Sequence, residues 1–374
     1  MVYNTGLWIE QDNPKKSVII QQQIPELQPN QVLIKLVHFG LTTNNITYVG
    51  LGKKYQYFDF FPTTETHGHK DHANIPVWGV GVIVKSTHNH LKTGERIYGY
   101  FPITQFYILT PNRVSPSFFD VLRPQLPVDR YVYNQYFRAN GDPEFSLKQE
   151  EHMMIYRPLW TTSFFLEDFL TVHQFFNSDQ IIISSASSKT SYCLALLLQN
   201  SKKNKKVIGL TSKNNLNFVN HLGLYDKVVT YDQLEKIDSN LKVVYVDVAG
   251  NLELNHKIER YFQTNLMKLI SAGMSHFESG QKPTFNPTVS NDERFISFFA
   301  PSWIQKRFKE SKNELIVKRK VAWNQLLTFA DRYIKLTFVY GPIETEQIYL
   351  NMLNGHVEPN QGFVISLFDN NAKL

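Results

Sequence analysis

The chain has 374 residues, of which 42% are hydrophobic and 19% charged, a balance typical of a soluble globular protein with one large or two ordinary domains. The net charge of +6 is small for this length and the lysines are scattered, so we expect no nucleic-acid partner. The single cysteine, Cys193, excludes an intrachain disulfide and a four-cysteine zinc site. No apolar run approaches the roughly 20 residues of a membrane helix, and residues 1–16 carry no signal-type apolar core, so we expect a cytoplasmic protein without a membrane partner.

Short strands are predicted to dominate the first part of the chain, up to about residue 140. Four segments there are rich in β-branched or aromatic residues and are separated by turn residues: 17–25, 31–41, 75–87 and 95–103. Strands of this length and spacing favour a small barrel.

Strands and helices alternate from about residue 164 onward. The strands are predicted at 180–187, 205–212, 227–232, 242–250 and 270–276, and the helices at 164–176, 191–201, 215–224 and 254–269. The strands are nearly all apolar, as buried parallel strands are. This alternation predicts an α/β unit with a doubly wound parallel sheet and helices on both faces.

A mixed pattern returns after residue 300. Helices are predicted at 321–334 and 343–355, and strands at 335–341 and 362–368. Gly355 would end the second of these helices.

The turn between the first parallel strand and its helix reads SSASSKT, residues 184–190. A Rossmann fold places a cofactor pyrophosphate at such a turn, against backbone N–H groups and the positive end of the helix. Small residues permit the close approach, serine hydroxyls can donate to phosphate, and a lysine adds positive charge. The residues expected to bind phosphate are Ser185, Ser187, Ser188, Lys189 and Thr190.

Two other interpretations of this turn remain. A Walker loop needs G-x-x-x-x-G-K-[ST], and only Lys189 and Thr190 match it. A serine-rich helix N-cap explains the composition without any ligand, although it is compatible with a phosphate site as well.

The end of the second parallel strand carries no acid. NAD-selective folds usually have Asp or Glu there to bind the ribose hydroxyls. Thr211, Ser212 and Lys213 stand in its place, and a hydroxyl with a lysine suits the 2′-phosphate of NADP(H). The alternative is a polar helix start without a cofactor role.

Five stretches in the same order resemble the medium-chain dehydrogenase/reductase superfamily: residues 26–55, 75–101, 217–232, 246–250 and 354–368. The resemblance covers nearly the whole chain and is to the zinc-free, quinone-oxidoreductase-like side. More narrowly, five short motifs look like a branch of that superfamily that is itself a family of unknown function: LTTNNITYVGLG, IPVWG, GERIYGYFP, SSASSKTS and FFAPSW. The stretch VDVAG resembles the end of the fourth Rossmann strand, which adds Asp247 and Gly250 to the expected cofactor residues.

The resemblance implies a discontinuous GroES-like substrate domain of residues 1–150 and 300–374, with a Rossmann-like nucleotide-binding domain of residues 151–299 inserted. It also implies NADP(H), a small-molecule substrate and a homodimer. The sequence departs from the family at the turn, where Ser185, Ser188 and Ser191 stand for glycines. If the turn needs a positive φ, each serine costs on the order of 1 kcal/mol.

In relatives, an Asn or Asp and a Tyr near the start of the chain line the nicotinamide pocket. Asn45 and Tyr48 lie in the matching stretch, together with Asn44, Thr47 and Tyr55. Reduction of a carbonyl or enone needs a proton donor, for which we expect Tyr48, with His276 as the second candidate. Each could equally be a core or pocket-lining residue whose polar group is hydrogen-bonded within the protein.

A histidine-rich loop offers His67, His69, Asp71 and His72 as metal ligands, but its spacing fits no regular element, so no metal site is expected. Three hypotheses therefore remain for the function. They are an NADPH-dependent, zinc-free reductase of an enone, quinone or acyl compound, a non-catalytic protein that has lost dinucleotide binding, and a metal-binding protein. We favour the first.

Overall fold

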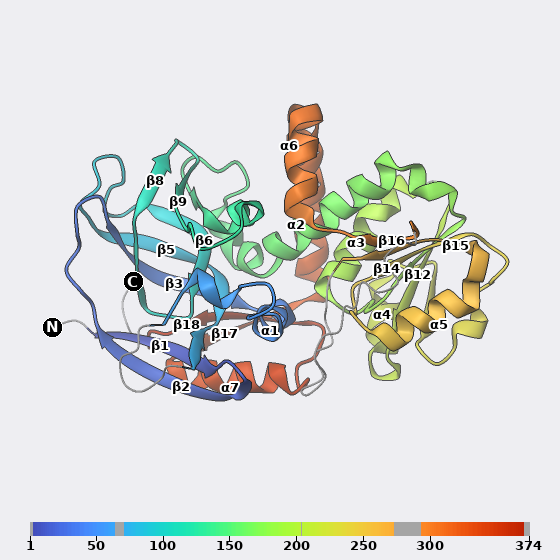
Figure 1. Cartoon of the computed structure of the whole chain (residues 1–374), viewed down its shortest axis with the longest axis horizontal. Helices are drawn as coiled ribbons and strands as arrows, with labels where there is room; N and C mark the ends of the chain where they lie inside the picture. Colours follow the sequence, from blue (N-terminus) through green and yellow to red (C-terminus); the bar gives the residue numbers. More distant parts are fainter. Residues whose placement is uncertain (1–2, 64–70, 203, 273–292, 370–374) are drawn as a thin grey trace. The chain divides into compact units, whose positions relative to one another are not determined.

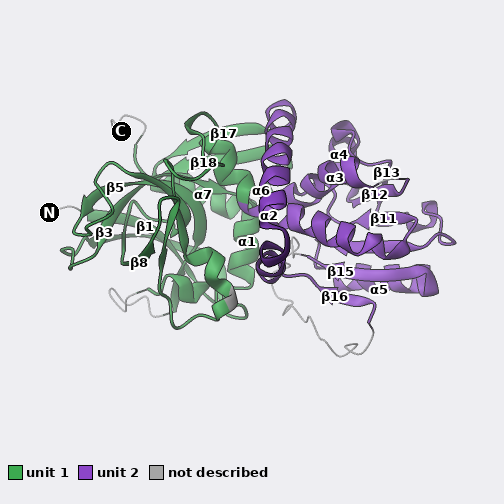
Figure 2. Ribbon diagram, turned by 90° about the horizontal axis from the view of Figure 1, so that it is seen from above, with its two compact units in different colours: residues 1–157, 334–374 green, residues 158–333 purple. Residues whose placement is uncertain are grey.

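The chain divides into two compact units in the computed structural model, which describes residues 3–63, 71–202, 204–272 and 293–369. Unit 1 consists of residues 1–157 and 334–374, and unit 2 consists of residues 158–333 (Figure 2). The α/β fold class is confirmed, since unit 1 is rich in antiparallel strands and unit 2 contains a parallel sheet.

The strands of unit 1 form two sheets within the described residues (Figure 1). The smaller sheet has the order β2-β1-β4, and the larger runs β17-β18-β3-β5-β6-β10-β9-β8, with β7 also paired to β3. Their bounds are β1 Tyr3–Glu10, β2 Asn13–Gln23, β3 Val32–Leu41, β4 His72–Asn74, β5 Pro76–Ser86, β6 Arg96–Pro102, β7 Phe106–Leu109, β8 Pro111–Val114, β9 Phe118–Val121, β10 Gln135–Arg138, β17 Lys335–Tyr340 and β18 Gln361–Ser366. A bridge between Gly6 and Thr104 links the two sheets.

Two helices belong wholly to unit 1, α1 (Thr43–Gly50) and α7 (Pro342–Leu353). The latter connects β17 and β18, which are parallel to each other, while β18 pairs antiparallel with β3. At Gly40 in β3, a Cβ atom would stand 2.6 Å from the carbonyl oxygen of Met154, so only glycine fits there. Met154 lies in α2 (Glu150–Val172), which runs from unit 1 into unit 2.

The parallel sheet of unit 2 has the strand order β13-β12-β11-β14-β15-β16. Numbered along the chain this is 3-2-1-4-5-6, the order of a Rossmann fold. The bounds are β11 Gln180–Ile183, β12 Lys206–Thr211, β13 Lys227–Thr230, β14 Val243–Asp247, β15 Leu266–Ser271 and β16 Phe295–Ser297. The helices are α3 Lys189–Ser201, α4 Leu216–Leu222, α5 Leu252–Phe262 and α6 Ala300–Tyr333.

Burial explains why these strands form. All four residues of β11 and all five of β14 are buried, so only a sheet covered on both faces accommodates them. On one face, Leu254, Ile258 and Phe262 of α5 pack in a core with Ile208 and Tyr245 of the sheet. The sheet is therefore a fixed platform whose loops carry the polar residues.

One predicted helix and one predicted domain boundary differ from the structure. The helix expected at 254–269 ends at Phe262, where Gln263 takes a φ of +48°, and β15 begins at Leu266. Residues 300–333 cluster with unit 2, although 300–374 was expected to return as a whole to the first domain. The reason is α6, whose rings pack within unit 2: Trp323 against Trp160 of α2, and Phe329 against Tyr192 of α3.

Candidate active site

The turn after β11 leads sharply from strand into helix without a glycine. Ser185 has a φ of +48°, in the left-handed region that costs a residue with a side chain about 1–2 kcal/mol. Ser188 is the N-cap of α3, and its hydroxyl accepts a hydrogen bond from the Ser191 amide at 3.3 Å. The start of α3 therefore lies at the carboxyl end of the first parallel strand, where Rossmann folds bind ligands.

The serine hydroxyls hold this turn together. Ser191 Oγ donates to the Ser184 carbonyl at 2.8 Å, and Ser188 Oγ donates to Ser191 Oγ at 2.9 Å. Ser184 Oγ accepts from the amides of Val248 and Ala249, each at 2.9 Å, which joins the turn to the loop after β14. These three hydroxyls are thus engaged with the protein and brace the backbone.

Two residues from later elements also hold the turn. The Ser185 amide donates to the Tyr231 hydroxyl at 3.1 Å, and Asn215 Nδ2 donates to Ser187 Oγ at 3.0 Å. The Ser185 amide, which a glycine-rich turn would offer to a phosphate, is therefore already used by a tyrosine that follows β13.

Two backbone amides remain open for a ligand. Among the described residues, the N–H groups of Ser187 and Thr190 have no hydrogen-bond partner. They lie at the start of α3, a helix of 13 residues whose N-terminus carries partial positive charge. The half-buried Lys189 adds an ammonium group, and burial lowers its pKa to about 8. This is an arrangement for an anion.

Asp247 braces the site from the end of β14. Its Oδ1 accepts from Ser184 Oγ at 3.2 Å and from the Gly250 amide at 2.9 Å, and its Oδ2 accepts from Asn255 Nδ2 at 2.8 Å. Burial raises the pKa of this carboxyl, although these hydrogen bonds oppose the shift. Asp247 and Gly250 therefore lie beside the turn and position it, with both carboxylate oxygens occupied.

The three residues expected to recognise a 2′-phosphate differ in exposure. Thr211 is buried, Ser212 is half-buried and Lys213 is exposed. The Lys213 ammonium lies 2.8 Å from Asp232, which follows β13, and this partner raises the lysine pKa. A 2′-phosphate at Lys213 would therefore compete with a carboxylate that is already present.

The residues present fit a dinucleotide with one restriction. The two open amides, the N-terminus of α3 and Lys189 match a pyrophosphate. Lys213 matches a 2′-phosphate once it exchanges Asp232 for the ligand. The restriction is the Ser185 amide, which Tyr231 occupies.

Tyr48 lies in α1 of unit 1 and is 5% exposed. Its hydroxyl oxygen accepts from Trp78 Nε1 at 3.1 Å. Burial raises the pKa of this phenol well above its usual range, Tyr57 adds to the rise, and hydrogen bonds from Trp78 and Asn44 lower it. Since the oxygen receives these bonds, its own proton is left to donate.

The Asn45 side chain forms hydrogen bonds that hold the backbone around Tyr48. Its Oδ1 accepts from the Thr42 amide at 2.8 Å in a capping box, and its Nδ2 donates to the Pro76 carbonyl at 2.8 Å. The side chain is 3% exposed. Asn45 therefore fixes the start of α1, and its role toward a nicotinamide remains a prediction.

An aromatic cluster surrounds Tyr48. The ring of Tyr48 lies 4.7 Å from Tyr57, 5.5 Å from Tyr100 and 6.4 Å from Tyr133, centroid to centroid. Trp78 lies 5.0 Å from Tyr100. These rings hold the Tyr48 hydroxyl in one place and give its surroundings an apolar, aromatic character.

Some expected residues fall outside the described part of the chain. His276 is one, and His67 and His69 of the histidine-rich loop are two more. Within the described residues, no group of three or more His, Cys, Asp or Glu side chains is placed to hold a metal. In that same part, no helix has the length and apolar character needed to cross a membrane.

Three residues of the site were not anticipated from the sequence: Tyr231, Asp232 and Trp78. Tyr231 and Asp232 directly follow β13 in the segment KVVTYD. Since β13 neighbours β12, its carboxyl end could have been expected beside Lys213. Trp78 lies 30 residues from Tyr48, and no local pattern indicates that contact.

A family profile described as "Protein of unknown function (DUF2855)" matches residues 39–358. The chain belongs to this family. The matched residues include parts of both units. No curated protein matches the sequence.

Solved structures with a similar fold align over nearly the full chain. CurA from Vibrio vulnificus in complex with NADPH has a TM-score of 0.61 at 10% identity, covering 98% of this chain and 99% of that one. The quinone oxidoreductase from Coxiella burnetii has a TM-score of 0.57 at 14% identity, covering 97% and 99%. TarJ from S. aureus in complex with NADPH has a TM-score of 0.54 at 12% identity, covering 98% and 99%.

These likenesses concern the fold. They confirm the resemblance to the zinc-free, quinone-oxidoreductase-like enzymes at that level, with a GroES-like β-rich unit and a Rossmann unit. At 10–14% identity they carry no residue roles over to this chain.

Proposed function

We propose that this protein is an NADP(H)-dependent, zinc-free oxidoreductase that reduces an enone, a quinone or an acyl-type small molecule. Unit 2 would bind the dinucleotide and unit 1 the substrate. The observation that carries the proposal is the start of α3, where two open amides and Lys189 follow the first strand of a sheet in Rossmann order. The structures of CurA and TarJ, which have this fold, contain NADPH.

When bound, the nicotinamide would supply a hydride to the electrophilic carbon of the substrate. The chain's own residues do the rest. The Ser187 and Thr190 amides bind pyrophosphate oxygens, and the Lys189 ammonium neutralises part of their charge. Tyr48 donates its proton to the reduced substrate, and the bonds from Trp78 and Asn44 stabilise the phenolate left behind.

The aromatic cluster around Tyr48 favours a flat, conjugated substrate, because such molecules stack on aromatic rings. We also propose a homodimer, which light scattering of the purified protein would test. A cytoplasmic location remains a prediction.

The test is a calorimetric titration with NADPH and, separately, NADH. Lys213→Glu should weaken NADPH binding about tenfold or more, since one charge-assisted contact is lost and a repulsion is gained. Lys312→Glu makes the same charge change on the exposed surface of α6 and should leave the affinity unchanged. If neither nucleotide binds the wild-type protein, the braced turn has lost dinucleotide binding and the non-catalytic alternative takes its place.

A further inference from the structure

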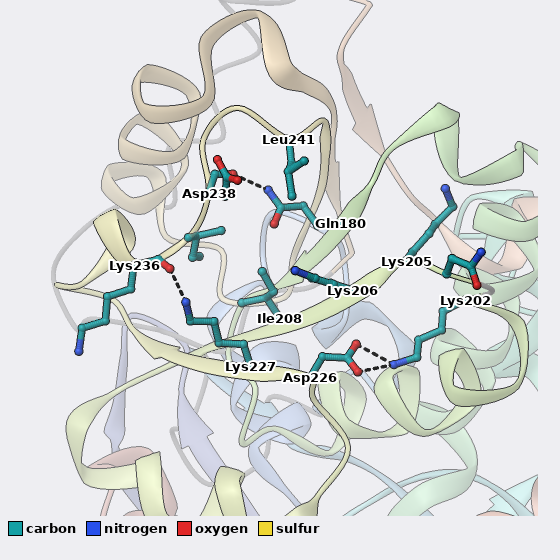
Figure 3. Close-up of a pocket in the computed structure, with 12 residues that line it drawn as sticks. Gln180, Lys202, Lys205, Lys206, Ile208, Asp226, Lys227, Lys236, Asp238 and Leu241 are labelled. Carbon is teal, nitrogen blue, oxygen red and sulfur yellow. Dashed lines mark hydrogen bonds and ion pairs between the residues drawn. The ribbon is translucent and has the colours of Figure 1, made fainter.

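A cavity lies at the opposite end of the parallel sheet from the serine turn. Its volume is about 470 Å³, and it is lined where β11, β12 and β13 begin and by the loop before β14. Gln180, Ile208 and Ile237 are buried and form its floor. Five lysines and two aspartates line the rest: Lys202, Lys205, Lys206, Lys227, Lys236, Asp226 and Asp238. We call this cavity the basic pocket (Figure 3).

Both aspartates of the basic pocket are already engaged. Asp226 lies 2.6 Å from the Lys202 ammonium and accepts from the Val207 amide at 2.7 Å. Asp238 Oδ1 accepts from the Asn240 amide at 3.0 Å. Their hydrogen bonds and close ion pair are therefore with Lys202 and with backbone, while Lys206 interacts with Asp226 only through longer-range attraction.

Four lysines of the basic pocket have no carboxylate partner among the described residues. Lys205 and Lys227 donate only to carbonyl oxygens, those of Ser178 and Lys236. Lys236 donates to the side-chain oxygen of Gln233 at 3.0 Å. Lys206 has no hydrogen-bond partner for its ammonium group in the described part of the chain.

The directions of these side chains differ. Figure 3 shows the Lys206 ammonium pointing to the middle of the basic pocket, between Gln180 and Ile208, while the Lys227 ammonium points to the Lys236 carbonyl oxygen. The Lys236 and Lys205 ammonium groups point outward at the rim in this view. Lys206 therefore faces the cavity, and the other three lysines stand around it on flexible stems.

Helix dipoles account for only some of the lysine positions in the basic pocket. Lys202 is the C-cap of α3, a position where a cation is stabilising. Lys206 and Lys227 instead begin strands β12 and β13, where no helix dipole favours them. Like charges placed together repel, so these positions call for another partner.

We propose that the basic pocket binds a small molecule carrying several phosphate groups. Four ammonium groups without carboxylates match several phosphates, each of which a lysine binds as a point charge. The volume is that of a small-ligand site, and the apolar floor of Ile208 and Ile237 leaves room for a short organic part. This site is separate from the dinucleotide turn and does not rest on the proposed function.

Inorganic tripolyphosphate is the probe, titrated into the full-length protein by calorimetry at low and at 0.3 M salt. The double variant Lys206→Gln/Lys227→Gln should weaken its binding at least tenfold. The matched control Lys312→Gln/Lys320→Gln removes two exposed charges from α6 and should leave it within twofold. Orthophosphate should bind far more weakly, and added salt should weaken both probes.

Two further measurements keep the outcome decisive. Removing repelling lysines should leave the melting temperature of the double variant unchanged or raised, so lost binding would not reflect misfolding. Lys189→Gln should leave intact the tripolyphosphate binding that the double variant loses, because that binding is at the basic pocket and not at the serine turn. A loss in Lys189→Gln alone would place the anion at the serine turn, and equal losses in the double variant and its control would mean non-specific charge attraction. Either result overturns the proposal.

Discussion

Two candidate functional regions, the Tyr48 hydroxyl in unit 1 and the serine turn in unit 2, are built in different ways. Neighbouring aromatic rings hold the Tyr48 hydroxyl in place, and it receives bonds from Trp78 and Asn44. Hydrogen bonds among serines hold the turn, which includes one strained residue, Ser185. A side chain held by packing keeps its position when one polar atom is removed. A turn held by hydrogen bonds loses part of its support with each bonded group that is removed. The catalytic rate and the stability of the fold should therefore respond to different substitutions.

The largest effect is expected for Tyr48→Phe. Loss of the proton donor should lower kcat by about 10²–10⁴-fold with little change in KM, because the ring and its packing remain. Steady-state kinetics on a conjugated carbonyl substrate measure it. Burial keeps the Tyr48 pKa above its ordinary value, so the phenol stays protonated and the wild-type rate should show no alkaline fall from this group below pH 9.

The control for Tyr48→Phe is Tyr57→Phe, which removes a hydroxyl from the ring 4.7 Å away. Its kcat should stay within a few-fold of the wild-type value. Equal losses in the two variants would show that the aromatic cluster matters as a whole and that Tyr48 is not the donor.

An intermediate effect is expected for NADPH binding as a function of pH. Burial lowers the pKa of Lys189 to about 8, so its ammonium is charged below that pH and neutral above it. The affinity for NADPH should therefore fall by up to about tenfold between pH 7 and pH 9, since the charged form contacts phosphate. Lys189→Arg stays charged over this range and should give a flat profile in the same titrations. A fall of the same size in Lys189→Arg would contradict the assignment.

The smallest effect is expected for Ser185→Gly. Glycine relieves the left-handed strain and keeps the backbone bond to Tyr231, but it costs chain entropy and the bond between the Ser185 side chain and Tyr231. Stability should therefore rise by at most about 1 kcal/mol. Ser187→Gly, in the same turn at a residue without positive φ, should instead lower stability by about 0.5–1 kcal/mol. Urea unfolding of the two variants measures the difference. The strain at Ser185 would be disproved by equal losses in both.

The strand, turn and helix from residue 181 to 198 could be predicted because their signals are local. An apolar run gives a buried strand, and serines before a second apolar run give an N-cap and a helix. That the sheet is parallel also followed from the alternation of strands and helices. What could not be predicted was which polar groups the turn would use for its own support, because Tyr231 and Asn215 reach it from 46 and 28 residues away.

The residues around Tyr48 show the same limit. The stretch TTNNITYVG indicated the position of Tyr48, but the donor to its hydroxyl comes from β5. Asn45 was expected near a cofactor, which stays a prediction, and the structure shows its amide bonded to Thr42 and Pro76. A capping box is a local signal that could have identified the first of these bonds.

The discontinuity of unit 1 has a consequence for how the chain folds during synthesis. Unit 2 is one continuous segment, so it can close as soon as residue 333 has been made. Unit 1 cannot, because β3 receives its neighbour β18 only from residues 361–366. Until then β7 pairs with β3 only at residues 32–35, and residues 39–41 have no strand on that edge. An open edge invites pairing with other chains. The early residues of this protein therefore need shielding while the later ones are still being added.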